Sequence, residues 1–459
     1  MTVLRRFTLF VVVASLLAPA AGAQAPARGD RRPNVLIIFT DDQRSDTMTV
    51  MPQVQKWFEQ KGTKYPNAYV GTPLCCPSRG TIMTGRYAHN HGVVDNGAHH
   101  NLDQRTTLQH LLGRAGYRTA IVGKYFNGWP LRQDPPHFDR FAIFRTGYHN
   151  TKFSVDGKVQ TIGRYSTDYI AKQSIRYLRS FEKRDKAPWL MYLAPSAPHD
   201  PFTPAARHAA APVSSWEPSP AVGEEDRSDK PPAVHAQNAV REHGEDLRTA
   251  QLRTLLAVDE MVGRVMAALG KLRERRNTLV FFFSDNGFHW AEHGVTDKRF
   301  PYTEGVSVPF YARWPGRIQP GGSDPRLVSL VDLAPTVLAA AGILPDPSLP
   351  PPDGRSLLDP WDRDHVFIEY FPDKTVTSIG PWASVRTRTA QYSEYYGADG
   401  VTIDFREYYD LERDPHQLRN LLGDEDPGND PSPAELQPLM VQLANNRSCQ
   451  GTIGTNPCP

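Results

Sequence analysis

Acidic and amide side chains follow two apolar runs of strand length in this chain. Asp41 and Asp42 come directly after PNVLIIFT, and Asp285 and Asn286 come after NTLVFFFS. A lone acidic pair or an Asp-Asn-Gly run is usually a helix cap or a turn. Three carboxylates gathered at neighbouring strand ends would repel one another unless a cation lay among them. All the donors are oxygen atoms, so the pattern predicts calcium or magnesium rather than zinc.

A second unusual feature is the pair of adjacent cysteines in LCCPSRGTIMTGR, residues 74–86. A disulfide between neighbours is strained, and zinc sites generally use spaced pairs of cysteines. Proline suits a first helical turn, so Pro77 places Cys75 at a helix N-terminus, where free N–H groups favour anions. Arg79 lies four residues after Cys75, hence on the same helical face, where we expect it to bind an oxyanion. The rest of the run is predicted to form an amphipathic helix.

The elements that must position these residues alternate between strands and helices. Apolar runs within 33–43, 117–128, 187–200 and 277–287 each end in polar residues, and helical stretches lie between them. This alternation predicts an α/β sandwich with a large, mostly parallel central sheet. Open sheets of this kind bind ligands outside the carboxyl ends of their strands. Those ends carry Asp41, Asp42, Lys124, His199, Asp285 and Asn286.

The chain is expected to contain a large domain and a smaller one. A Pro-rich break near residues 350–355 separates the α/β part, residues 34–355, from shorter strand-like runs. These runs predict a C-terminal domain over residues 356–459 with an antiparallel sheet. Residues of about 203–245 lack clear periodicity, so we expect a long surface excursion that flanks the site.

The N-terminal residues indicate export. Two arginines precede an apolar stretch that is too short to span a membrane, and the small residues after it suit cleavage. We therefore expect a signal peptide over residues 1–23 and a linker over residues 24–33. The mature protein is expected to be secreted or periplasmic. No later run predicts stable membrane insertion. Export permits disulfides, and Cys449 and Cys458 are close enough in sequence to close a small loop. The formal charge of +2 gives no electrostatic reason to expect nucleic acid or membrane binding.

Several motifs together point to a known family. Residues 75–79 (CCPSR) match the C-x-P-S-R signature of the type I sulfatases, and residues 84–86 supply the family's T-G-R element. Residues 123–125 resemble the G-K-[WY] motif, and residues 284–287 match S-D-N-G. The chain is most similar to the N-acetylglucosamine-6-sulfatases and their heparan endosulfatase relatives, from about Asn34 onward. The resemblance implies an alkaline-phosphatase-like sandwich fold.

The resemblance also implies a modified cysteine. By the motif match, a formylglycine-generating enzyme oxidises Cys75 to formylglycine, while Cys76 fills a variable position as a small buried side chain. One hydroxyl of the hydrated aldehyde, a gem-diol, then attacks the sulfur of a sulfate ester, and the other expels sulfate. The implied ligands of calcium, with magnesium as the alternative, are Asp41, Asp42, Cys75, Asp285 and Asn286. The resemblance implies that Arg79 takes part in catalysis. It implies that Lys124, His199 and Lys298 take part in catalysis and also bind the substrate, a sulfated amino sugar or glycosaminoglycan.

The chain departs from the family pattern at one position. Many sulfatases have a histidine two residues after the motif lysine, where this chain has Phe126, although the glucosamine-6-sulfatase branch also tends to lack that histidine. The base that acts on the formylglycine hydroxyl is therefore unassigned, with His89, His91 and His289 as candidates. Two other functions stay open: a phosphodiesterase or phosphonate monoester hydrolase of the same superfamily, and a non-catalytic sugar-binding protein in which Cys75 is never converted.

Overall fold

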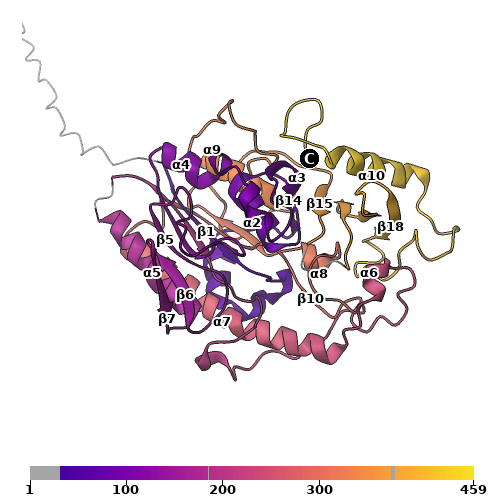
Figure 1. Ribbon diagram of the computed structural model, residues 1–459, viewed down its shortest axis with the longest axis horizontal. Helices are drawn as coiled ribbons and strands as arrows, with labels where there is room; N and C mark the ends of the chain where they lie inside the picture. Colours follow the sequence, from indigo (N-terminus) through magenta and orange to yellow (C-terminus); the bar gives the residue numbers. More distant parts are fainter. Residues whose placement is uncertain (1–31, 184–185, 374–377) are drawn as a thin grey trace, which may run out of the picture.

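The computed structural model describes residues 32–183, 186–373 and 378–459. The expected signal peptide over 1–23 and most of the expected linker over 24–33 lie outside the described residues. A ten-stranded sheet lies between layers of helices, and a four-stranded antiparallel sheet lies toward the C-terminus (Figure 1). The predicted α/β class, with its additional small antiparallel sheet, is confirmed.

Five parallel strands form the centre of the large sheet. In spatial order they are β9 (Thr278–Ser284), β1 (Asn34–Thr40), β8 (Trp189–Ala194), β4 (Arg118–Lys124) and β5 (Arg140–Phe144). Their apolar residues are buried on both faces, as a parallel sheet covered by helices requires. Antiparallel pairing extends the sheet beyond β9 and beyond β5. The outer strands are β12 (Phe310–Arg313), β2 (Thr63–Lys64), β13 (Gly322–Ser323), β6 (Thr151–Val155) and β7 (Lys158–Ile162).

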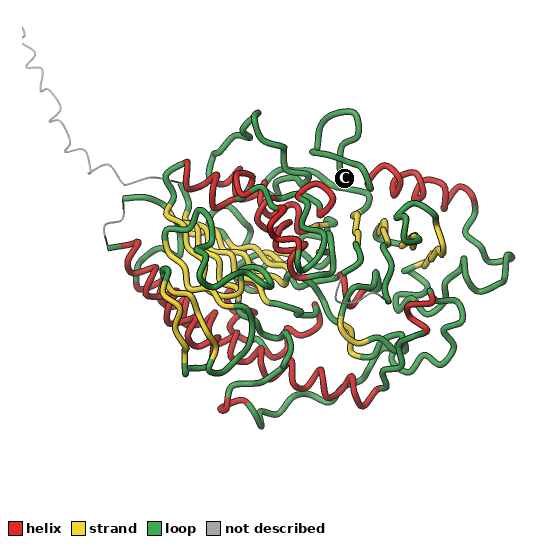
Figure 2. Tube along the Cα trace, in the orientation of Figure 1, coloured by secondary structure: helices red, strands yellow, loops and turns green. Residues whose placement is uncertain are grey.

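Helices cover both faces of this sheet (Figures 1 and 2). Val35 and Ile37 of β1 share one hydrophobic core with the first group of helices, and Leu36 and Ile38 share a second core with the other group. This alternation is the period of two expected of a strand. The first group is α2 (Cys75–Thr84), α4 (Leu108–Arg114) and α9 (Leu333–Ala340), and the second is α5 (Ser166–Glu182) and α7 (Arg241–Lys271).

Helix α2 is not the amphipathic helix that its sequence predicts. All ten of its residues are buried, because the helix packs against α9 and α3 (Ala88–His91) as well as against the core of the sheet. Its polar side chains are bound within the protein: the Ser78 hydroxyl donates to the backbone carbonyl of Asp285 at 2.5 Å, and Thr81 bonds His91 at 3.2 Å. A helix buried all round belongs to the interior, so α2 is a rigid support for its first residue.

The C-terminal sheet is an antiparallel meander covered by one helix. Its strands are β15 (Val366–Tyr370), β16 (Trp382–Arg386), β17 (Ala390–Tyr396) and β18 (Ile403–Asp410), and the helix is α10 (Pro433–Asn446). Glu407 of β18 is fully buried and accepts hydrogen bonds from three tyrosines. Two of them, Tyr395 and Tyr409, belong to the same sheet, and the third, Tyr302, comes from the large α/β part. A buried carboxylate thus ties the two parts together.

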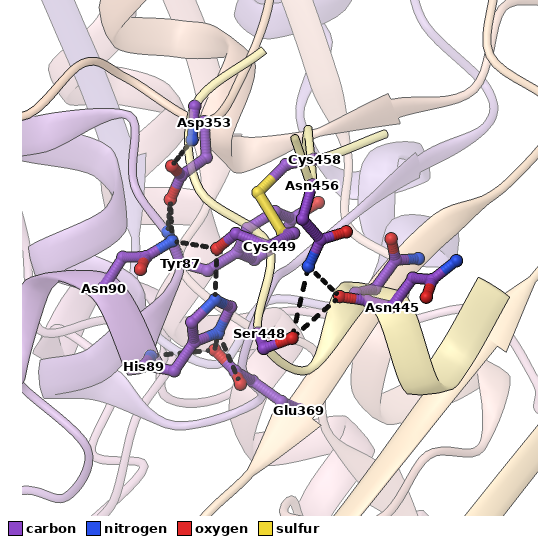
Figure 3. Close-up of a disulfide and its surroundings, with 12 residues drawn as sticks. Tyr87, His89, Asn90, Asp353, Glu369, Asn445, Ser448, Cys449, Asn456 and Cys458 are labelled. Atoms are coloured by element: carbon purple, nitrogen blue, oxygen red, sulfur yellow. Dashed lines mark hydrogen bonds and ion pairs between the residues drawn. A yellow bond between two sulfur atoms is a disulfide. The ribbon is translucent and has the colours of Figure 1, made fainter. Parts of the chain in front are cut away.

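A disulfide joins Cys449 to Cys458 after α10 (Figure 3). The bridged loop lies against α3, because the side chains of His89 and Asn90 both bond the backbone carbonyl of Cys449, at 3.0 and 2.8 Å. Gly451 in the same loop donates its N–H to Asp353 at 2.8 Å. The end of the chain is therefore fastened to the segment that follows α2.

Residues 203–240 form the long excursion predicted from the sequence, and α7 begins at Arg241, slightly earlier than expected. Within the described residues, no helix has both the length and the apolar character needed to cross a bilayer. Short elements complete the fold: α1 (Pro52–Val54), β3 (Ala68–Tyr69), α6 (Pro232–His235), β10 (His289–Trp290), β11 (Thr296–Asp297), α8 (Thr303–Val306) and β14 (Val328–Ser329).

Candidate active site

Four adjacent strands deliver six of the predicted site residues to one edge of the sheet. Strands β9, β1, β8 and β4 are neighbours and run parallel, so their carboxyl ends meet at the same edge. Thr40 pairs with Ser284 in the β1–β9 register, which sets the acidic pair after Thr40 beside the Asp-Asn pair after Ser284. Lys124 ends β4, and His199 follows β8 after a short loop. The convergence predicted from the sequence is present.

Three buried carboxylates form the centre of the site. Oxygen atoms of Asp41, Asp42 and Asp285 lie within 4.8 Å of one another. Asn286 donates its Nδ2 to Asp42 at 2.6 Å, while its buried Oδ1 has no hydrogen-bond partner among the described residues. A buried polar atom left without a partner is costly, and a hard cation would take this amide oxygen together with the carboxylates as its ligands. The donor set fits calcium or magnesium.

Three buried basic side chains face these carboxylates. Lys124 Nζ donates to Asp41 Oδ2 at 2.5 Å, and Lys298 forms an ion pair with Asp42. Arg79 pairs with Asp41 at 3.2 Å and with the third carboxylate at 2.8 Å. Three positive side chains thus balance three negative ones, and repulsion among the carboxylates does not by itself require a cation. The unpartnered amide oxygen is the stronger indication of a metal.

This arrangement of charges separates the pKa values of two neighbouring carboxyl groups. Burial alone would raise the pKa of Asp41, but the positive charges around it, first that of Lys124, hold it far below its ordinary value. Burial and repulsion by Asp41 raise the pKa of Asp285 to about 6, against the opposing effect of Arg79. Of these two groups, Asp285 is the one that takes up a proton first as the pH falls.

Cys75 is the first residue of α2 and its Sγ contacts this cluster. Leu74 before it is extended, so the helix begins at the cysteine. The Sγ lies 3.4 Å from Asp41 Oδ1 and 3.3 Å from Lys298 Nζ. Burial and the charge of Asp41 raise the pKa of the Cys75 thiol to about 12. An unmodified Cys75 is therefore a neutral thiol at physiological pH and a poor nucleophile.

The neighbouring Cys76 has different surroundings. It is fully buried, its backbone N–H donates to the side-chain oxygen of Asn96 at 3.0 Å, and its Sγ accepts the backbone N–H of Asn127 at 3.1 Å. These contacts are those of a small packing residue, the role expected for Cys76 from the sequence.

A pocket of about 350 Å³ opens onto Cys75, and Asp42, His199 and Lys298 share its lining. His199 Nδ1 donates to the backbone carbonyl of Asp200 at 2.8 Å, and its Nε2 lies 3.9 Å from Asp42 Oδ2. Five predicted residues are absent from this lining: Asp41, Asp285, Asn286, Arg79 and Lys124. Arg79 and Lys124 are at most 1% exposed and contact the carboxylates, so they reach the pocket only through those groups.

The three histidines considered as the base also lie outside the pocket lining. His89 pairs with Glu369 at 2.9 Å, and His91 bonds Thr81 at 3.2 Å. His289 bonds the backbone carbonyl of Asp297 at 3.0 Å. These side chains are engaged in the surrounding structure, and the base that acts on residue 75 stays unassigned.

Six polar residues of the pocket lining were not predicted from the sequence: Asn96, Asp200, His243, Thr296, Asp297 and Arg299. Asp297 and Arg299 flank Lys298, adopt positive φ angles of 81° and 88° and form an ion pair with each other, so their position next to a motif residue was a usable signal. Asn96 lies in the loop after α3, and His243 lies in the first turn of α7. Neither belongs to a motif, and only the fold brings them to the pocket.

Comparison with known proteins decides the family. Residues 33–343, more than half of the chain, match the family model described as Sulfatase. The chain belongs to the sulfatase family. A second model, described as N-sulphoglucosamine sulphohydrolase, C-terminal, matches residues 291–445 of this sulfatase. The prediction of a sulfuric ester hydrolase is confirmed.

Relatives of this sulfatase include enzymes of the predicted branch. N-acetylglucosamine-6-sulfatase from Homo sapiens is 30% identical over 96% of this chain and 89% of its own length. N-acetylglucosamine-6-O-sulfatase from Bacteroides thetaiotaomicron is 29% identical over 91% of this chain and 87% of its own. A protein solved in complex with its substrate, D-glucosamine-2-N,6-O-disulfate, is 26% identical with a TM-score of 0.79, covering 91% of this chain and 97% of that one. The predicted resemblance to this branch is confirmed.

Proposed function

We propose that this sulfatase hydrolyses a sulfate ester on a sulfated amino sugar or glycosaminoglycan. One observation carries the proposal: a single pocket is lined by Cys75, by the carboxylate of Asp42, and by Lys298 and His199. The volume of about 350 Å³ suits a sugar-sized ligand. The names of the two N-acetylglucosamine-6-sulfatase relatives and the glucosamine disulfate bound to the structural relative support the choice of substrate class.

Residue 75 is proposed as the nucleophile after conversion to formylglycine by a formylglycine-generating enzyme. The position of Cys75 in the C-x-P-S-R motif supports this, as does the raised pKa of its thiol, which makes the unmodified side chain a weak nucleophile. The hydrated aldehyde supplies the attacking oxygen. Residue 75 is the first residue of α2, where the free N–H groups of the helix favour negative charge.

The proposed cation is calcium, with magnesium as the alternative. When bound, it supplies positive charge that polarises the sulfate group and offsets the charge that develops during transfer. The residues proposed to hold it are Asp41, Asp42, Asp285, Asn286 and the converted Cys75.

The basic side chains are proposed to act in two ways. Lys298, which lines the pocket, would contact sulfate oxygens directly. The motif assigns Lys124 the same contact, but its Nζ pairs with Asp41 outside the lining, so Lys124 would reach a sulfate oxygen only by leaving that ion pair. Arg79 is proposed to hold the carboxylates of Asp41 and Asp285 in place, because it forms an ion pair with each of them. His199 is proposed to bind the ester and to protonate the leaving alcohol, because the hydrogen bond from its Nδ1 to a carbonyl leaves Nε2 free.

The protein is proposed to be secreted or periplasmic after removal of a signal peptide over residues 1–23. The disulfide between Cys449 and Cys458 supports this, since disulfides persist in oxidising compartments. Catalysis is assigned to a domain over residues 34–355, with a smaller domain over residues 356–459.

The proposal is tested by mass spectrometry of the peptide that spans residues 65–86, on protein from its native host, combined with kinetics. We expect an aldehyde at Cys75, chelator-sensitive sulfate release and a higher kcat/KM for N-acetylglucosamine 6-sulfate than for N-acetylgalactosamine 6-sulfate. Cys75→Ser should abolish turnover, and Cys76→Ser should retain it. An unmodified thiol in active protein, or faster turnover of phosphate diesters than of sulfates, would instead favour the phosphodiesterase or phosphonate monoester hydrolase reading.

A further inference from the structure

Before Cys75 is converted, its thiol adds a sulfur atom to the possible metal ligands of the site. The Cys75 Sγ, a ring nitrogen of His199 and a carboxylate oxygen of Asp41 lie within 4.8 Å of one another. We propose that the thiol form of this protein binds a thiophilic divalent cation of the Zn²⁺ class through these three side chains. The proposal requires only that Cys75 carries a thiol, and it does not rest on the sulfatase reaction.

The spacing of the three ligands suits a tetrahedral zinc site. Zinc–ligand distances of about 2.0 to 2.3 Å place neighbouring ligand atoms roughly 3.3 to 3.8 Å apart. The Cys75 Sγ and Asp41 Oδ1 already lie 3.4 Å apart. The His199 side chain is 22% exposed and borders the pocket, so it has room to close a remaining gap of at most about 1.5 Å toward them.

The orientation of the His199 ring supports the same conclusion. Histidines that bind metals usually donate their other ring N–H to a carbonyl or carboxylate, which fixes the tautomer and leaves one nitrogen for the metal. His199 Nδ1 bonds the carbonyl of Asp200 at 2.8 Å, and its Nε2 lies 3.9 Å from Asp42 Oδ2. The outer hydrogen bond of a metal-binding histidine is therefore already in place.

Asp42, which lies outside the group of three, is proposed as the fourth ligand, because it can bind through Oδ2 and keep its existing partners. Its Oδ1 receives the bonds from Lys298 and Asn286, whereas its Oδ2 is the atom nearest His199. A set of thiolate, imidazole and two carboxylates matches the softness of Zn²⁺, and the sulfur suits calcium poorly. Binding exchanges the thiol proton of Cys75 for the cation. Lys298, now 3.3 Å from the Sγ, stays paired with Asp42.

The preferred cation should therefore depend on the chemical state of residue 75. Conversion of the thiol to an aldehyde removes the sulfur ligand and leaves an all-oxygen set with Asp41, Asp42, Asp285 and Asn286. The unconverted protein would favour Zn²⁺, and the converted protein calcium.

The test uses the full chain, with the thiol at residue 75 verified by mass spectrometry. Co²⁺ serves as the spectroscopic probe, because a tetrahedral cobalt–thiolate site shows a charge-transfer band and visible d–d bands, and Zn²⁺ then displaces it. We expect one equivalent to bind. Cys75→Ser should abolish the charge-transfer band, while the matched variant Cys76→Ser should keep it. Loss of an orienting partner alone weakens metal binding about 10- to 100-fold, so His199→Ala should weaken Zn²⁺ binding at least tenfold.

Two results overturn the proposal. One is a charge-transfer band that survives in Cys75→Ser or disappears in Cys76→Ser. The other is calorimetry in which the thiol form binds Ca²⁺ more tightly than Zn²⁺. His199 borders the pocket and is not one of the buried residues, so we expect His199→Ala to fold. Its Zn²⁺ affinity decides the matter if Cys75→Ser does not fold. The converted form, measured in parallel, should show no thiolate band.

Discussion

The Nζ of Lys298 lies 3.3 Å from the Sγ of Cys75, at the first residue of a fully buried helix. The same ammonium pairs with Asp42. Burial alone would lower the pKa of Lys298, but the charge of Asp42 raises it well above its ordinary value, so the lysine is charged throughout the working pH range. One positive group thus contacts both the residue proposed for conversion and a carboxylate proposed as a metal ligand.

Lys298→Ala should lower kcat/KM for 4-nitrophenyl sulfate by about 10²- to 10³-fold, the usual cost of removing one preorganised group that stabilises transition-state charge. Lys158→Ala is the matched control, because Lys158 is exposed on β7 at the far edge of the sheet. Steady-state kinetics of the two variants and the parent enzyme measure the effect. A loss of less than about fivefold for Lys298→Ala would show that the lysine only balances the charge of Asp42.

Asn286→Ala should weaken the binding of Ca²⁺, because the unpartnered Oδ1 of Asn286 is proposed as a metal ligand. We expect the concentration of Ca²⁺ that restores half of the activity after chelation to rise about 10- to 100-fold. Asn445→Ala, in an exposed part of α10, should leave it unchanged. Equal Ca²⁺ requirements in the two variants would remove Asn286 from the ligand set.

The parts of this site that the sequence predicts are those with a local signal. The run of β1 is apolar because the strand is buried on both faces, and Asp41 and Asp42 mark its end in the sequence. The parallel register then places them beside Asp285. The wrong prediction for α2 has the opposite cause. Part of its burial comes from packing against α9, more than 200 residues later in the chain, which no local pattern reports. His243 reaches the pocket through the same kind of long-range placement.

The ion pair between His89 and Glu369 should make stability depend on pH. Burial alone would lower the pKa of His89, but Glu369 raises it from 6.5 to about 9. Because the folded value lies above the unfolded one, the stabilisation is fully present below pH 6.5 and is lost as the pH rises through 9. A shift of this size corresponds to roughly 3 kcal/mol.

Urea unfolding at pH 6 and pH 10 tests this pair. Glu369→Gln should lower the free energy of unfolding markedly at pH 6 and much less at pH 10. Glu412→Gln, at an exposed glutamate, serves as the control and should change it little at either pH. The same loss for Glu369→Gln at both pH values would mean that His89 does not carry the charge inferred here.

Replacing both Cys449 and Cys458 with serine should lower the free energy of unfolding by about 2 to 3 kcal/mol, as expected for a short bridged loop. The loop is fastened to α3 through His89 and Asn90, so its release should also increase hydrogen exchange in that helix. Reductant should reproduce the loss in the parent protein and have no effect on the double variant. Equal unfolding curves for the parent and the double variant would indicate that contacts around the loop suffice without the bridge.

His199→Ala should affect substrates in proportion to their need for a proton on the leaving group. The Nε2 of His199 faces the pocket 3.9 Å from Asp42, while its Nδ1 is held by a backbone carbonyl. An alkyl sulfate such as N-acetylglucosamine 6-sulfate releases a strongly basic alkoxide, so loss of a general acid should lower its kcat by about 10²- to 10⁴-fold. 4-Nitrophenyl sulfate releases a stable phenolate and should lose less than about tenfold.

The matched control for this prediction is His208→Ala. His208 lies nearby in the chain, in the excursion over residues 203–240, but it pairs with Glu260 on α7 and is absent from the pocket lining. It should change neither substrate's kcat. Equal losses on the two substrates for His199→Ala would assign the histidine to binding alone, because a residue that only holds the sulfate does not sense the basicity of the leaving group. A selective loss on the sugar sulfate would assign the proton transfer to His199, as proposed above.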